Sequence, residues 1–251
     1  MTNGALVRFS SDLNPANQPV SALVPIRFRD IALFLLGNGF IGCVIALLTG
    51  LPAYSFTHSK FVAECIGGIS LYATFIVGYC WTSQEWDWTG LRTRFSPVGR
   101  KPLILSALTA IATIAFIYMV RWILLRAGVK FADVPGPIEM DSWKQLPLAL
   151  LLVVLMAPLS EELLFRGLLL DWLRQKMNVW AAAIILSVIF SLLHANPFSL
   201  GAVGWLSFSA RFLAGLTASA FAIKYHSLRP AFVLHATWNA IGCLAGVLND
   251  A

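Results

Sequence analysis

Long apolar stretches separated by short polar segments are the main feature of this sequence. Crossing about 30 Å of hydrocarbon takes roughly 20 apolar residues in a helix, so each stretch of that length predicts one transmembrane helix. The predicted helices cover approximately residues 31–51, 61–81, 102–125, 147–175, 179–195, 200–222 and 230–248. The pattern therefore predicts an all-α, polytopic transmembrane helical bundle of about seven spans, within a range of six to eight.

Two boundaries in this pattern need comment. The first helix is predicted to end at Leu51-Pro52, because proline disrupts a helix. The connection 196–201 carries no charge, so it can turn inside the protein instead of reaching water, which is possible only where protein or a cavity surrounds it. The number of spans after residue 178 is open for this reason.

The helix predicted over 147–175 differs from the others. At 1.5 Å per residue it would be about 40 Å long, so one end should protrude from the membrane, and Asp171 and Arg174 mark that end. Pro158 removes a helical hydrogen bond and frees a carbonyl, so the helix should either kink there or restart at Ser160. A restart would place the carboxylates that follow at a helix N-terminus, where the dipole favours negative charge.

Composition supports a membrane protein and limits its partners. Apolar residues make up 58% and charged residues 12% of the 251 positions, and the mean hydropathy is +0.76. No hydrophilic stretch is long enough to form a soluble domain. The net charge of +6 comes mostly from short loops, so we expect no nucleic-acid partner. The four cysteines show no CxxC spacing and are expected to be buried free thiols.

Loop charges predict the orientation. With the N-terminus in the cytoplasm, the inner segments hold most of the loop Lys and Arg, as the positive-inside rule requires. The inner residues are Arg8, Arg27, Arg29, Arg92, Arg94, Arg100, Lys101, Arg174, Lys176, Lys224 and Arg229, and the outer ones are Lys60, Arg126, Lys130 and Lys144. We expect a multi-pass membrane protein with a cytoplasmic N-terminus, and the short loops suggest a bacterial inner membrane.

Charged side chains inside the predicted helices are the candidate functional residues. An ionised carboxylate in hydrocarbon costs several kcal/mol, so it predicts a functional site with a partner. Glu162 and Arg166 are four residues apart and can form an ion pair on one helix face, which leaves Glu161, rotated by about 100°, without a cation. Arg211 lies mid-span in the sixth helix and could contact substrate, pair with a glutamate or extend to the headgroups.

Two later helices carry one histidine each, and helix geometry places both near Glu161. If the fourth and fifth helices form a hairpin turning at 175–178, Glu161 and His194 both lie about 20 Å from the turn. His235 lies about five residues into the last helix, which enters from the same side, so all three side chains are expected about 10 Å below the cytoplasmic membrane surface. Asn239, one turn after His235, shares its face.

These groups suit amide hydrolysis. That reaction needs a base for water, a donor for the tetrahedral oxyanion and an acid for the leaving amine. No serine or cysteine with an adjacent base is evident, so water is the expected nucleophile.

Three short motifs in this order on successive apolar helices resemble those of the CPBP family, which includes CAAX prenyl proteases of the Ras-converting type and the bacteriocin-processing, or Abi, proteins. The motifs are Glu161-Glu162-x-x-x-Arg166, Phe190-x-x-x-His194 and His235-x-x-x-Asn239. Together they cover roughly the last hundred residues, and all signature residues are present.

The resemblance implies a glutamate-dependent intramembrane endopeptidase. In such an enzyme Glu161 and His194 would activate the hydrolytic water, His235 and Asn239 would stabilise the oxyanion, and Glu162 and Arg166 would support the site. We then expect a cytoplasmic tail at 1–30, three N-terminal transmembrane helices with loops at 31–146, and a CPBP-like catalytic core at 147–248.

Metal dependence has two readings at this point. Two histidines and a glutamate form the ligand set of many catalytic zinc sites, and the family has long been called metalloproteases, with Glu161, His194 and His235 as the ligands here. The HExxH spacing that places two ligands and a base on one helix is absent. We therefore expect no cofactor and metal-free glutamate catalysis, with zinc as the alternative.

Two other functions compete with a protease. A non-catalytic scaffold or regulator that binds a partner's transmembrane helix would tolerate Glu161→Gln. A transporter would usually show broken helices in two repeated halves, and no internal repeat is present. The expected partners are the lipid bilayer and a membrane-associated substrate, which can be a prenylated, lipid-anchored or transmembrane protein or peptide. The motifs carry no signal for the oligomeric state.

Overall fold

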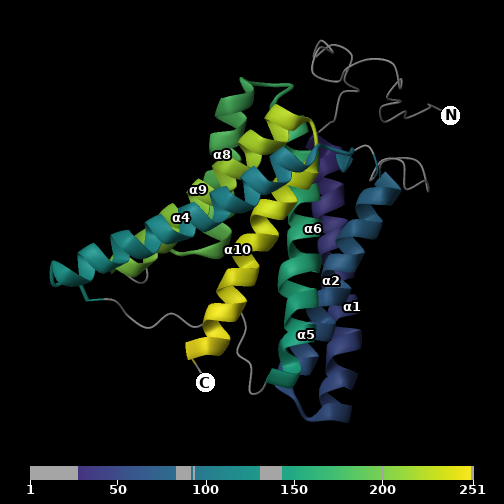
Figure 1. The fold of residues 1–251 in the computed structure, drawn as a ribbon. Helices are drawn as coiled ribbons and strands as arrows, with labels where there is room; N and C mark the ends of the chain where they lie inside the picture. Colours follow the sequence, from purple (N-terminus) through teal and green to yellow (C-terminus); the bar gives the residue numbers. More distant parts are fainter. Residues whose placement is uncertain (1–27, 83–91, 93, 131–142, 199–200, 250–251) are drawn as a thin grey trace.

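The computed structural model describes residues 28–82, 92, 94–130, 143–198 and 201–249, and every element in these ranges is helical (Figure 1). This confirms the all-α fold class. Most of the predicted tail at 1–30 lies outside the described residues. The long helices are α1 (Phe28–Thr57), α2 (Lys60–Thr82), α4 (Arg100–Arg126), α8 (Val179–His194), α9 (Gly201–Tyr225) and α10 (Leu228–Asn249), with a helical rod between α4 and α8.

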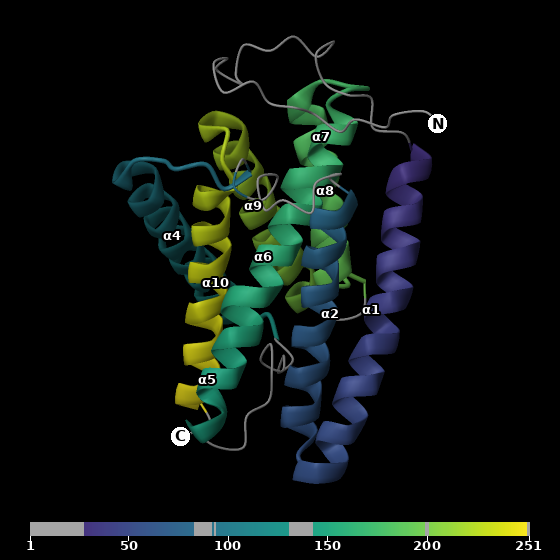
Figure 2. The ribbon, with the colours of Figure 1, turned by 90° about the vertical axis from the view of Figure 1, so that its right-hand side faces the viewer.

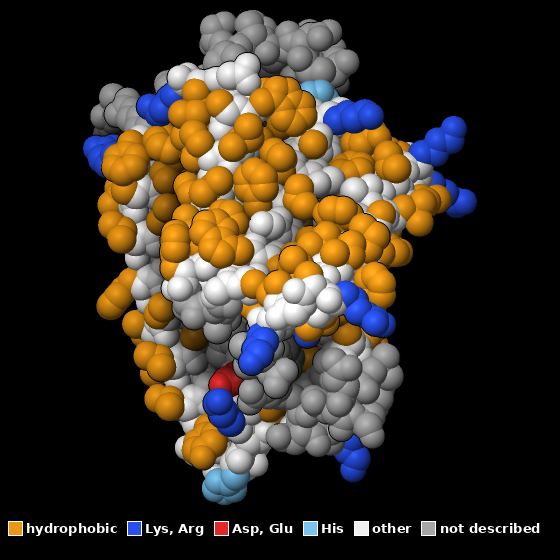
Figure 3. All heavy atoms as spheres, turned by 90° about the vertical axis from the view of Figure 1, so that its left-hand side faces the viewer, with side chains coloured by type: hydrophobic (Ala, Val, Ile, Leu, Met, Phe, Trp, Pro, Cys, Tyr) orange, Lys and Arg blue, Asp and Glu red, His pale blue; other side chains and the backbone are white. Residues whose placement is uncertain are grey.

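The described helices have the length and surface of a membrane bundle. Five are long and apolar enough to cross a membrane, namely α1, α2, α4, the rod at Leu146–Leu173 and α9. Large hydrophobic side chains such as Leu36 and Phe40 of α1 are exposed on the outside. Figure 3 shows a face on which hydrophobic side chains predominate. The protein is therefore a polytopic transmembrane bundle.

The rod lies in the middle of the bundle and carries the candidate carboxylates. One side of the rod packs against α2, which packs along α1, and the other side packs against α10 (Figures 1 and 2). In turn α10 contacts α4 and α9, and α8 pairs with α9. Side chains from both sides of the rod form buried apolar clusters, in which Leu163 and Leu234 are almost fully enclosed.

Two changes of winding mark the rod. It runs through α5 (Leu146–Ala149), a π-helical segment (Leu150–Met156), α6 (Ala157–Glu162), a second π-helical segment (Leu163–Leu169) and α7 (Leu170–Leu173). α6 runs without a break through Pro158 and Ser160, and Met156 before it is also helical, with φ −71° and ψ −46°. The restart at Ser160 is therefore wrong. The wider π winding before Pro158 accommodates a ring that would clash with an α-helical carbonyl.

The first helix also passes through a proline. It continues beyond Pro52 to Thr57, so the predicted end at Leu51-Pro52 is wrong. Proline removes only one N–H of the helix, and hydroxyl side chains in the last turn add further bonds to helix carbonyls. Ser55 Oγ donates to the Leu51 carbonyl at 3.1 Å, and Thr57 Oγ1 donates to that of Ala53 at 2.7 Å.

The hairpin that joins the rod to α8 turns where the sequence predicts it. Residues 174–178 form the turn, and Asn178 Oδ1 accepts a hydrogen bond from the Trp180 N–H at 2.9 Å to cap α8. α8 has 16 residues and is about 24 Å long, shorter than a full span. The chain then passes close over α9, where a Cβ on Gly204 would lie 2.7 Å from the Asn196 carbonyl oxygen. This part of the uncharged connection lies against protein.

The cysteines are free thiols, as expected, but not all of them are buried. Cys65 and Cys243 are buried, Cys80 is half-buried, and Cys43 is exposed on α1. The expectation of burial is therefore wrong for Cys43. A thiol is a small apolar group, so it tolerates a lipid-facing position as well as a packed one.

Candidate active site

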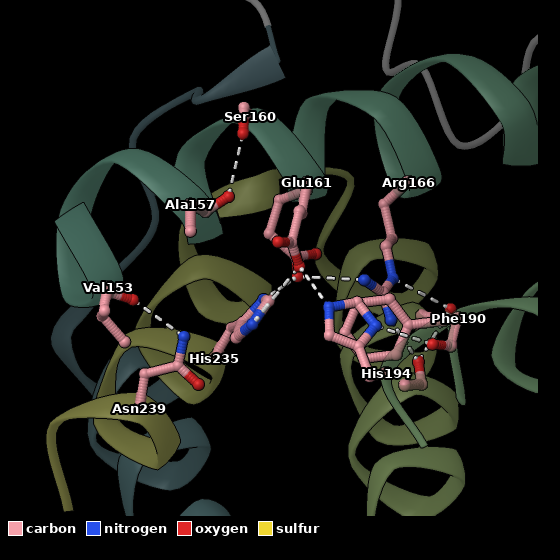
Figure 4. Close-up of polar contacts among 12 residues, drawn as sticks. Val153, Ala157, Ser160, Glu161, Arg166, Phe190, His194, His235 and Asn239 are labelled. Carbon is pink, nitrogen blue, oxygen red and sulfur yellow. Dashed lines mark hydrogen bonds and ion pairs between the residues drawn. The ribbon is translucent and has the colours of Figure 1, made fainter. Parts of the chain in front are cut away.

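Three helices bring one carboxylate and two imidazoles together inside the bundle (Figure 4). Glu161 comes from α6, His194 from the last residue of α8, and His235 from α10. Nε2 of His194 lies 3.5 Å from Oε2 of Glu161, and Nε2 of His235 lies 3.7 Å from the same oxygen. The structure therefore joins the three side chains that helix geometry places at one level.

The second nitrogen of each imidazole fixes the position of its proton. Nδ1 of His194 lies 2.7 Å from the Phe190 carbonyl oxygen, and Nδ1 of His235 lies 2.8 Å from Oε1 of Glu162. Both partners can only accept, so both Nδ1 atoms carry hydrogen. When the rings are neutral, each Nε2 therefore turns a lone pair toward Glu161. Oε2 of Glu161 is itself buried and receives no hydrogen bond from the described residues, so the three atoms form a site for a proton donor.

Glu162 and Arg166 form the predicted ion pair one turn apart. Arg166 Nη1 lies 3.0 Å from Glu162 Oε1, and the side chains are 2% and 0% exposed. A buried charge is tolerated only when it is paired and its remaining donors are bonded. Arg166 meets that condition, because Nη2 donates to the Gly215 carbonyl at 2.8 Å and Nε to Ser219 Oγ at 3.3 Å. The pair holds Oε1 of Glu162 against His235.

Asn239 lies one turn beyond His235 and bonds the backbone of the rod. Its Nδ2 donates to the Val153 carbonyl at 2.8 Å. That carbonyl needs an outside donor, because the Ala157 N–H bonds to the Leu152 carbonyl, and the next residue, Pro158, has no N–H. The carbonyl freed by the proline is therefore satisfied by a side chain of α10, and one of the two amide hydrogens of Asn239 is engaged.

All six candidate residues line one cavity of about 620 Å³. Its remaining lining comes from α2, the rod, α8, α9 and α10. These residues are Gly68, Leu71, Tyr72, Leu152, Val153, Ala157, Phe190, Arg211, Ala214, Ala218, Leu234 and Trp238. Apolar groups thus form most of the wall, and the charged groups lie among them, an arrangement typical of a site that orients a substrate with few polar contacts.

Two contributors to this site were not expected from the sequence. The Tyr72 hydroxyl of α2 donates a hydrogen bond to Oε1 of Glu161 at 3.4 Å. None of the three motifs lies in the first three spans, so they did not point to this residue. A single tyrosine in an apolar helix is no signal by itself, and only its depth in the span could have drawn attention to it. The Val153 carbonyl cannot be found from side-chain patterns, but the proline five residues later could have pointed to it.

The described residues do not offer a preformed metal site. Among them, no group of three His, Cys, Asp or Glu side chains is placed to hold a metal ion. The candidate zinc ligands Glu161, His194 and His235 are not among such groups, and the chemistry below is derived from the side chains alone.

An ion pair outside the cavity holds the end of the rod. Arg94, in the segment before α4, pairs with Asp171 of α7, which also lies 3.1 Å from Arg174 Nε. Burial lowers the pKa of the Arg94 guanidinium, but the Asp171 carboxylate and the Tyr79 hydroxyl raise it by more, so the net pKa is above the usual value. Arg94 is therefore a permanent cation that anchors the helix bearing the two glutamates.

Comparison with known proteins shows that part of the chain is similar to a known family. Residues 143–241 match the family model described as type II CAAX prenyl endopeptidase Rce1-like. This confirms the resemblance to the CPBP family, and the Rce1-like family is a family of proteases. An uncharacterised 24.3 kDa protein of Escherichia coli is 30% identical over 141 residues, which are 54% of this chain and 62% of that protein. The match thus spans less than two thirds of that relative. No solved structure matches the chain significantly.

Proposed function

Because residues 143–241 carry a type II CAAX prenyl endopeptidase Rce1-like domain, we propose that this membrane protein is an intramembrane endopeptidase. It would hydrolyse a peptide bond of a membrane-associated protein or peptide by means of water that Glu161 activates. The observation that supports this best is the convergence of Oε2 of Glu161 with Nε2 of His194 and Nε2 of His235 at the wall of one cavity.

The first step is attack by water. A water molecule between Glu161 and His194 donates one hydrogen to Oε2 of Glu161 and the other to the lone pair of His194 Nε2. Its oxygen attacks the scissile carbonyl carbon while Glu161 takes up the proton. The carbonyl π electrons move to the carbonyl oxygen, so a tetrahedral intermediate with an oxyanion forms.

The oxyanion needs a donor, and His235 is placed to supply one. With both nitrogens protonated, His235 donates Nδ1–H to Glu162 and Nε2–H to the oxyanion, and the Glu162 carboxylate stabilises the imidazolium. Asn239 contributes its second amide hydrogen and, through Val153, holds the rod in place. Arg166 pairs with the Glu162 carboxylate and orients it.

Collapse of the intermediate completes the reaction. The proton on Glu161 passes to the leaving amide nitrogen, the C–N bond breaks, and the products are a carboxylic acid and an amine. Glu161 returns to its carboxylate form and can accept a proton from the next water. No cofactor takes part in these reaction steps.

We further propose the setting of the reaction. The protein resides in a bacterial inner membrane with its N-terminus in the cytoplasm, as the loop charges favour. The substrate is prenylated, lipid-anchored or transmembrane, because a soluble chain has no reason to enter a cavity between transmembrane helices.

The decisive experiment compares new peptide termini in membranes from cells that carry the wild type, Glu161→Gln or Glu64→Gln at equal expression. Glu64 is a matched control, because it is an exposed glutamate of α2 that pairs with Lys60 away from the cavity. Termini present with the wild type and Glu64→Gln but absent with Glu161→Gln would support proteolysis and identify the substrate. Identical termini in all three strains would refute the proposed function and favour a non-catalytic scaffold.

A further inference from the structure

Arg211 is a cation in the candidate active site that the proposed reaction does not use. It lies in the middle of α9 and lines the same cavity as Glu161 and His194. Its only hydrogen-bond partner among the described residues is Ser207, one turn earlier on the same helix. Nη1 contacts the Ser207 carbonyl oxygen at 3.3 Å and also Ser207 Oγ.

The two arginines of the cavity differ in how their charge is balanced. Arg166 has an ion pair with Glu162, bonds from three of its nitrogens, and the Phe190 ring 5.1 Å from its Cζ atom, so it is fully engaged. Arg211 makes no ion pair with any carboxylate in the part of the chain that the structure describes. A cation inside a membrane is costly unless a partner or a function maintains it.

The lining of α9 leaves room beside this guanidinium. Ala214 and Ala218 follow Arg211 at helical spacings of three and seven residues and line the same cavity. Their side chains are short, so a ligand can pass along this wall to the guanidinium. Nη2 and Nε of Arg211 donate to no described residue, and a guanidinium fork matches a carboxylate with two parallel hydrogen bonds.

We propose that Arg211 is a specificity residue that binds a carboxylate of the substrate, and so selects peptides with a negative charge close to the scissile bond. The carboxylate can be the α-carboxylate of the C-terminal residue or the side chain of an aspartate or glutamate. Both carry the same chemistry. This inference rests on the proposed protease function in one respect: the bound peptide is a substrate only if the protein hydrolyses it. The binding itself does not depend on hydrolysis.

The test measures binding of a defined set of probes. These are acetylated leucine tetrapeptides as free acids, the same peptides as C-terminal amides, and amides with one aspartate in place of a leucine. Their affinity for the purified protein in detergent micelles is measured by calorimetry for the wild type, Arg211→Gln, Arg211→Lys and Lys224→Gln. Lys224 is the control, since it lies on the same helix, outside the cavity, against the ring of Tyr225.

We expect the wild type and Lys224→Gln to bind the acid roughly tenfold or more tightly than the amide, the effect of a charge-assisted pair in a protected site. The preference should disappear in Arg211→Gln and shrink in Arg211→Lys, which keeps the charge and loses the fork. Arg211→Lys also serves if Arg211→Gln does not fold. Aspartate amides that bind as tightly as the acids would identify a side-chain carboxylate, and weak binding of these amides would identify the C-terminus.

Two results would overturn the proposal, namely equal affinities for acid and amide in the wild type, or a preference that persists in Arg211→Gln. The proposed hydrolysis can fail independently. A carboxylate preference in a protein whose membranes show no Glu161-dependent termini would refute the protease and keep the binding site. Glu161-dependent termini together with an unchanged carboxylate preference in Arg211→Gln would support the protease and refute the binding site.

Discussion

The bond between Asn239 and the Val153 carbonyl leads to the sharpest prediction about how the site is held. Asn239→Ala should remove the donor from a carbonyl that the rod cannot satisfy itself, since residue 158 is proline and the Ala157 N–H is used by Leu152. The same substitution in a Pro158→Ala background should matter less. Pro158→Ala would restore a backbone N–H at position 158, which can reach the Val153 carbonyl in the π winding, and a relaxed α winding would offer that carbonyl the N–H of Ala157 instead.

The expected magnitude follows from the burial of this bond. An unsatisfied buried carbonyl costs about 1–3 kcal/mol, and hydrogen bonds between transmembrane helices are worth about 0.6 kcal/mol on average and up to about 1.7. We therefore expect Asn239→Ala to lower the free energy of unfolding by about 1–2 kcal/mol. In the Pro158→Ala background the loss should be less than half of that, so the coupling energy is about 1 kcal/mol.

The assay is reversible unfolding of the purified protein by SDS in mixed micelles, followed by tryptophan fluorescence. Four proteins complete the double-mutant cycle. A second cycle with Asn38→Ala of α1, whose side chain lies against Gly78 of α2, is the control and should be additive with Pro158→Ala. Additive effects of Asn239→Ala and Pro158→Ala would refute the reasoning, because Val153 would then not depend on Asn239.

Three further predictions concern the polar network. Arg166→Met should destabilise the protein by about 3–5 kcal/mol, because it leaves Glu162 buried without a cation, and Glu162→Gln in the same chain should recover part of the loss in SDS unfolding. A cost below about 1 kcal/mol would contradict the buried pair. Tyr72→Phe should lower kcat about fivefold with little change in KM, as expected for one orienting hydrogen bond worth about 1 kcal/mol. An unchanged kcat would mean that the hydroxyl does not orient Glu161. Treatment with 1,10-phenanthroline should leave peptide cleavage intact, and a loss that zinc restores would contradict metal-free catalysis.

The sequence predicted what depends on helix geometry alone. The rise per residue is nearly constant, so counting from the turn at 175–178 placed Glu161 and His194 at one level. In the structure, Nε2 of His194 lies 3.5 Å from Oε2 of Glu161. The i, i+4 spacing predicted the pair of Glu162 and Arg166 in the same way.

The contacts that the sequence missed depend on packing between helices or on a change of winding. Tyr72 reaches Glu161 only because α2 packs against the rod, and no local pattern in α2 specifies that contact. The π segments were not predicted. A π turn differs from an α turn by a single hydrogen-bond register, so a short π segment produces no distinct pattern of apolar and polar residues in the sequence. Pro52 and Pro158 were both expected to disturb a helix, and neither breaks its helix.

The short length of α8 bears on how water reaches a site surrounded by lipid. A helix of 16 residues is about 24 Å long, whereas the hydrocarbon layer is about 30 Å thick, and this helix stops at His194 inside the bundle. The bilayer next to a short transmembrane helix thins to match it, at a modest energetic cost. The bilayer should therefore be thinnest beside His194, so that in the proposed reaction hydrophobic mismatch would bring water to the site.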